Sequence, residues 1–217
     1  MSDETAPDAP TDAPSLMTPG RLEAFSDGVL AILITIMVLE LKVPHSAELH
    51  ALRPLVPVFL SYVLSFVYIG IYWNNHHHLL KRTSTVTGGI LWANLDLLFW
   101  LSLVPFGTAW MGENSFAPIP TAVYGVILLL AALAYYLLVR ALISAPGQAP
   151  AIATALGSNR KGQVSPVIYA IAVPISLVAP WLAFALYVAV AVLWIVPDRR
   201  IERALAPMRQ DQPEIDA

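Results

Sequence analysis

The stretch that decides the fold is Arg21-Leu-Glu-Ala-Phe-Ser-Asp-Gly-Val-Leu-Ala-Ile-Leu-Ile-Thr-Ile-Met-Val-Leu-Glu-Leu-Lys-Val-Pro44. From Leu22 to Val43 it is almost wholly apolar, over about the 20 residues that an α-helix needs to cross a bilayer. It nevertheless carries Asp27, and a lone carboxylate at membrane depth is costly. The stretch therefore predicts a membrane-spanning helix whose acid has a partner, a water-filled path or a function.

The whole chain has the composition of a polytopic membrane protein. Of its 217 residues, 57% are hydrophobic and 12% are charged, whereas soluble domains carry about 25% charged residues. We therefore predict an all-α integral membrane protein with six transmembrane helices. The apolar segments run from Leu22 to Val43, about Leu55 to Trp73, Ile90 to about Met111, Thr121 to about Leu142, and through Val164–Val196, which we divide in two near Pro180.

Charge distribution predicts the orientation of these helices. With both termini on one side, ten of the 12 Lys and Arg residues fall on that side, and only Lys42 and Arg53 fall on the other. Because cytoplasmic loops carry an excess of Lys and Arg, we expect both termini to be cytoplasmic. We expect a disordered acidic tail over residues 1–18, a six-helix transmembrane domain over 19–203 and a flexible tail over 204–217.

The first helix presents two different faces at 100° per residue. One face is a stripe of bulky side chains, with Thr35 at its border. Asp27 lies nearly opposite this stripe. The stripe fits plain contact with lipid or another helix, or a pore wall in which apolar rings form a constriction. Asp27 fits either a structural pair with Arg21, a His or an Asn, or direct contact with an ion. The stripe consists of Phe25, Val29, Ile32, Ile36, Leu39 and Val43.

Three adjacent histidines, His76 to His78, follow the second apolar segment. Neighbours on a helix point about 100° apart, whereas metal ligands on a helix need spacings of three or four residues. We therefore predict no metal or haem site. We expect a hydrogen-bonded network at the cytoplasmic end, in which one histidine reaches the first helix near Ser26 and Asp27. Imidazole would make such a network sensitive to pH.

The third apolar segment carries two polar residues, Asn94 and Asp96, which we expect to bond between helices. Pro105 in the same segment is expected to kink the helix. The sequence holds no nucleophile–base arrangement, phosphate loop or dinucleotide fingerprint, so it predicts no enzyme chemistry. It also has no cysteine, which excludes disulfides and thiol catalysis.

These motifs resemble a known family. An Arg21-x-x-x-Phe25-Ser26-Asp27 motif opens an apolar helix that ends Leu39-Glu-Leu-Lys-Val-Pro44. This pattern is similar to the signature of the lysosomal potassium channel family, transmembrane protein 175, in its prokaryotic single-repeat branch. The stretches Trp73…His76-His77 and Asn94…Pro105-Phe106 are also similar to that family, and the resemblance extends from about Arg21 to Arg203.

The resemblance implies a homotetrameric, potassium-permeable channel in a bacterial inner membrane. The first helix of each subunit would line the pore at the symmetry axis, without a conventional selectivity-filter loop. The partners implied are potassium ions, the lipid bilayer and copies of the chain, with no nucleic acid, no metal and no other cofactor. Carried over by their offset from the motif, the constriction residues are Ile32, Ile36 and Leu39, and the selectivity-related residue is Thr35. The family's interhelical polar network corresponds to Arg21, Phe25, Ser26 and Asp27, with His77 of the second helix as the expected partner.

Two other functions stay open on the residues themselves. One is a secondary or proton-coupled transporter in which Asp27 and a histidine of the second helix relay protons. Transporters favour inverted repeats and broken helices at mid-membrane, and only the prolines of the fifth helix fit that pattern. The other is a membrane enzyme or haem protein, for which the histidine triplet is the sole support. For a channel, we expect modest selectivity, because apolar rings cannot coordinate an ion as carbonyls do.

Overall fold

The structure is a computed structural model that describes residues 17–150, 152 and 160–195. Almost all of the expected N-terminal tail, the expected C-terminal tail and the end of the six-helix domain after residue 195 lie outside the described residues. In the described part the regular structure is helical. Its single β-type contact is an isolated antiparallel bridge between Met17 and Val86.

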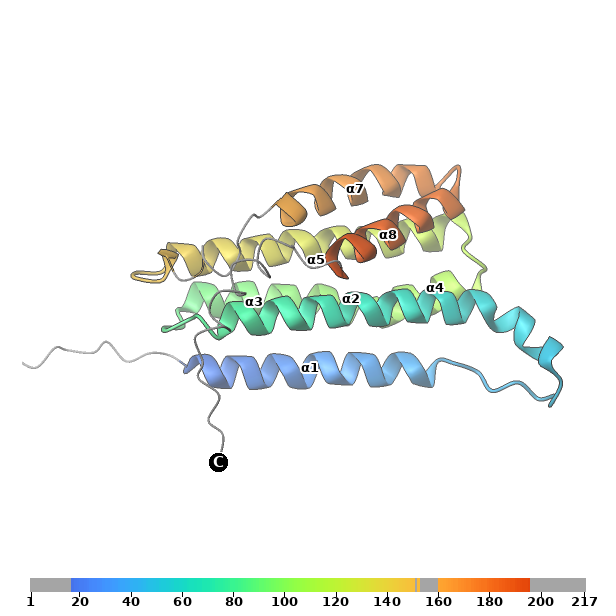
Figure 1. Cartoon of the computed structure of the whole chain (residues 1–217), viewed down its shortest axis with the longest axis horizontal. Coiled ribbons are helices and arrows are strands. Elements are labelled where there is room, and N and C mark those ends of the chain that lie inside the picture. The colour runs from blue at the N-terminus through green and yellow to red at the C-terminus, as the bar shows by residue number, and fades with distance from the viewer. Residues whose placement is uncertain (1–16, 151, 153–159, 196–217) are drawn as a thin grey trace, which may run out of the picture.

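The long helices lie side by side, and successive spans run in opposite directions (Figure 1). Four apolar spans are long enough to cross a membrane, namely Pro19–Leu39, Leu49–Leu80, Gly88–Glu113 and Pro118–Ser144, and α8 is a shorter apolar helix. The prediction of an all-α integral membrane protein is therefore confirmed. In chain order the elements are α1 (Pro19–Leu39), the 3-10 helix η1 (Leu49–Leu55), α2 (Val56–Leu80), α3 (Gly88–Ser102), α4 (Val104–Glu113), α5 (Pro118–Ser144), α7 (Arg160–Ser176) and α8 (Pro180–Ile195).

Prolines lie at two of the helix boundaries. Pro105 has no amide hydrogen to donate to the carbonyl of Leu101, and the third span is divided at Leu103 into α3 and α4. The interruption is one residue long, and Gly88–Glu113 still forms a single apolar span. Pro180 begins α8 after a short turn, which confirms the predicted division of the last apolar stretch near that residue.

Helix α2 extends beyond the apolar segment that ends at Trp73 and reaches Leu80. Its 25 residues span roughly 38 Å at 1.5 Å per residue. This length exceeds the ~30 Å hydrocarbon core of a bilayer. All three histidines, from His76 to His78, therefore lie on the last turns of this helix, which is long enough to extend past the hydrocarbon core.

Close helix packing depends on small residues and hydroxyl groups. A Cβ added at Gly112 of α4 would lie 2.8 Å from the Cα of Val58 in α2, so only glycine permits this approach. Deeper in the bundle, the Ser65 hydroxyl bonds with those of Thr108, at 2.5 Å, and Tyr124, at 2.9 Å. These contacts join α2, α4 and α5 by the small residues and interhelical hydrogen bonds typical of membrane bundles.

Helix α1 lies at one edge of the bundle (Figure 1) and contacts α2, α3 and α4. Only one of its faces is covered by the other helices. Its buried residues are Leu22, Ser26, Leu30, Leu33 and Met37.

Candidate functional site

The uncovered face of α1 carries the residues expected to form a constriction. Ile32 is 56% exposed, Ile36 is 42% exposed and Leu39 is 81% exposed. Thr35 is also exposed, and its hydroxyl donates to the carbonyl of Ile32 at 2.8 Å. A single subunit therefore leaves a strip of bulky apolar side chains without a protein partner among the described residues.

A chain of buried polar groups ties the opposite face of α1 to α3 and α2. The Ser26 hydroxyl donates to the carbonyl of Leu22 at 2.8 Å, and the Asn94 amide donates to the Ser26 oxygen at 3.0 Å. The Asn94 side-chain oxygen lies 2.7 Å from Nε2 of His76. Because that oxygen only accepts hydrogen bonds, Nε2 carries the donated hydrogen. At 1% exposure or less, all three side chains are fully buried.

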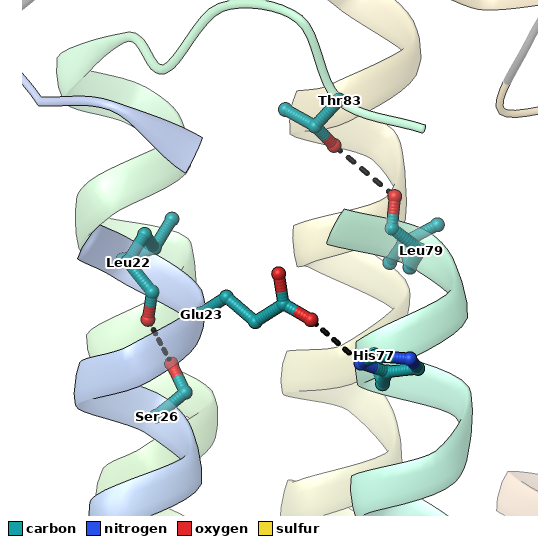
Figure 2. A network of polar contacts seen from close by, with 6 residues as sticks. All are labelled: Leu22, Glu23, Ser26, His77, Leu79 and Thr83. Atoms are coloured by element: carbon teal, nitrogen blue, oxygen red, sulfur yellow. Dashed lines mark hydrogen bonds and ion pairs between the residues drawn. The ribbon is translucent and has the colours of Figure 1, made fainter. Parts of the chain in front are cut away.

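A second contact joins α1 to α2 nearer the surface. Nδ1 of His77 lies 2.6 Å from Oε1 of Glu23, and both side chains are about three-quarters buried (Figure 2). The His77 ring also stacks on Trp73, with 5.9 Å between ring centroids. Together with the Ser26–Asn94–His76 chain, this contact anchors the first two turns of α1.

The predicted motif residues are only partly brought together. Ser26 is in the network, but its bond to Asn94 leads to His76, and His77 contacts Glu23 instead of Ser26 or Asp27. Adjacent residues on α2 point about 100° apart, so one histidine faces α3 while the next faces α1. Sequence reasoning passed over Glu23, although the helical wheel places it on the same side of α1 as Asp27.

The other motif residues take no part in these hydrogen bonds. Arg21 and Phe25 have exposed side chains. Asp27 is half-buried, and its Oδ1 atom has no hydrogen-bond partner among the residues that the structure describes. Nδ1 of His76 is likewise without a hydrogen-bond partner there.

Two further sequence expectations concern Asp96 and metal binding. Asn94 bonds between helices as expected, but Asp96 accepts a hydrogen bond from Trp100 on its own helix, at 3.2 Å. Within residues 17–150, 152 and 160–195, no group of three or more His, Asp or Glu side chains has the geometry to hold a metal ion.

Comparison with known proteins decides the family. A family model described as the endosomal/lysosomal potassium channel TMEM175 matches residues 21–105. A protein named a potassium channel, from Chryseobacterium sp. (strain P1-3), is 50% identical over 189 residues, which are 87% of this chain and 98% of that protein. The chain belongs to the TMEM175 family. A second protein named a potassium channel, from Streptomyces collinus (strain DSM 40733 / Tue 365), is 38% identical over 124 residues, or 54% of this chain and 60% of that protein.

A solved structure of the TMEM175 family has the same fold. It is described as a crystal structure of a lysosomal potassium-selective channel TMEM175 homolog from Chamaesiphon minutus. The TM-score is 0.71 at 29% identity, over 82% of this chain and 96% of that chain. TMEM175 is a channel family, so the enzyme alternative is excluded, and the comparisons give no support to the transporter alternative.

The region matched by the TMEM175 family model contains every residue of the exposed stripe and of the polar network. Residues 21–105 extend from the start of α1 to the beginning of α4. Helices α5, α7 and α8 follow the matched region in the sequence. They lie on the side of α2 and α3 that faces away from α1 (Figure 1). The matched part therefore comprises α1 together with α2 and α3, the two helices to which its polar contacts attach it.

Proposed function

We propose that the protein is a potassium-permeable, weakly selective cation channel made of four copies of the chain. In this proposal α1 of each copy stands at the symmetry axis and lines the pore. The observation that carries it is the division of α1 into two faces. Buried polar contacts fix one face to α2 and α3, while the other presents Ile32, Ile36 and Leu39 uncovered.

The three apolar positions form the narrowest rings of the proposed pore. Ile32, Ile36 and Leu39 follow one another at intervals of four and three residues, so they occupy successive turns of one side of α1. Narrow apolar rings resist wetting, and an ion that enters them loses part of its hydration. Thr35 supplies a hydroxyl next to these rings, where it can favour one ion over another.

The proposed channel lies in a bacterial inner membrane, with both termini in the cytoplasm. Lys81 and Arg82 directly follow α2 at the membrane side where α1 begins, and Arg140 lies near the same side in the last turns of α5. Lys42 and Arg53 lie at the other side. This asymmetry is the one that the positive-inside rule associates with cytoplasmic ends.

Cysteine substitution tests the placement of the pore. The chain has no native cysteine, so a thiol reagent acts only at the introduced residue. We expect a charged methanethiosulfonate to reduce potassium current strongly in Ile32→Cys, Ile36→Cys and Leu39→Cys channels, because the added group narrows a constriction. Recordings in planar bilayers before and after the reagent measure this effect.

Val38→Cys is the matched control for these recordings. Val38 is 45% exposed in the subunit, similar to Ile36, but lies on another side of α1. The reagent should leave its current nearly unchanged. Equal block at all four positions would show that the assigned stripe is not the pore wall.

A further inference from the structure

The segment after α1 forms a half-open pocket together with η1 and the first turns of α2. Its volume is about 320 Å³, within the range of roughly 300–1,000 Å³ that is usual for small-molecule sites. Seven of its lining residues are apolar, and Lys42 is the eighth. The apolar lining comprises Leu41, Leu52, Leu55, Val56, Val58, Phe59 and Leu60. A ligand for this pocket must therefore be largely hydrocarbon.

The length of α2 favours a position for this pocket near the level where lipid chains meet lipid headgroups. Its wall includes Val56, Val58, Phe59 and Leu60 at the start of α2. The roughly 38 Å length of α2 exceeds the ~30 Å hydrocarbon core. Its other wall, η1, belongs to the same apolar span but precedes α2. An acyl chain of this leaflet is therefore a candidate occupant of the pocket.

One cation, Lys42, lines this pocket, and a second, Arg53, lies next to the lining on η1. The two differ in their partners. Nζ of Lys42 is 2.6 Å from Oε1 of Glu113, so its charge is balanced within the subunit. Arg53 lies between the pocket residues Leu52 and Leu55 on η1, is exposed, and forms no ion pair with a described residue. Its guanidinium is suited to bidentate contact with a phosphate group.

We propose that this pocket binds one acyl chain of an anionic phospholipid, whose phosphate contacts Arg53. The hydrocarbon lining accommodates the chain, and the unpaired guanidinium distinguishes an anionic headgroup from a zwitterionic one. Leu41 and Lys42 lie two and three residues after the end of α1, so the bound lipid also contacts the segment that follows that helix. Lipid binding at this site does not require ion permeation, so it can be tested without measuring ion flux.

Lipid protection of an introduced cysteine tests the site in the purified full-length oligomer in detergent. Leu55→Cys places a thiol in the pocket wall, and Leu52→Cys provides a second, more exposed position. Phosphatidylglycerol at ten times its Kd should slow maleimide modification of either thiol about tenfold, because only the free fraction reacts. Phosphatidylcholine at the same concentration should have little effect.

Two further variants separate the headgroup contact from general shielding by lipid. Arg53→Gln added to Leu55→Cys should remove most of the protection by phosphatidylglycerol while leaving the pocket unchanged. Ile119→Cys, exposed at the same membrane end but outside the pocket, should react at one rate in both lipids.

Three results would overturn the proposal. If the two lipids protect equally, the site does not recognise the anionic headgroup. If neither lipid slows the labelling, no lipid occupies the pocket. Slow labelling that becomes fast only when the oligomer is dissociated into subunits would show that a second copy of the chain covers the pocket.

Discussion

Replacing Ile32 with asparagine is expected to raise potassium flux about tenfold and to weaken the preference for potassium over sodium. A tenfold rise corresponds to about 1.4 kcal/mol removed from the barrier to permeation. The carboxamide hydrates the narrow ring, so that an ion crosses it with less loss of water. Flux of each ion into liposomes containing the purified Ile32→Asn channel, compared with the unmodified protein, measures both effects.

Val38→Asn is the control for this variant, because it places the same side chain on another exposed part of α1. We expect its flux and selectivity to stay close to those of the unmodified channel. If Ile32→Asn leaves flux and selectivity unchanged while the protein remains folded and oligomeric, Ile32 does not form a constriction.

Replacing Asn94 with leucine is expected to destabilise the protein by about 1–3 kcal/mol. Leucine is close to asparagine in size, so the main loss is the hydrogen-bond acceptor for Nε2 of His76, which is buried. A buried donor left without a partner costs about this much. Thermal unfolding of the purified oligomer in detergent should show a clearly lower midpoint for Asn94→Leu.

Asn74→Leu, on the exposed side of α2, is the comparison for the Asn94 variant and should unfold close to the unmodified protein. The double variant Asn94→Leu/His76→Phe should lose less stability than the sum of its two single changes, because both polar partners are then absent. Strictly additive losses would contradict the Asn94–His76 bond.

Much of the fold could be predicted from the sequence, because lipid imposes simple requirements on length and polarity. The first span and the division near Pro180 follow from apolar length and from the missing amide hydrogen of proline. The division at Leu103 was less predictable, since a proline within a membrane helix produces either a bend or a break according to the packing around it.

The site was predicted less completely, since it depends on which way neighbouring side chains point. A run of three histidines does not show which ring faces α3, and the structure assigns His76 to Asn94 and His77 to Glu23. The helical wheel does predict that Ile32, Ile36 and Leu39 share a side. Their exposure depends instead on the positions of α2, α3 and α4, which arise from contacts between distant segments.

The most direct test of the central claim is potassium flux into liposomes that contain only the purified, unmodified protein. We predict a flux well above that of protein-free liposomes, carried by potassium in preference to sodium and continuing down the potassium gradient without a proton gradient. Absence of flux of either ion from folded, oligomeric protein would contradict the account. Potassium uptake that requires a proton gradient would also contradict it, and would favour a carrier.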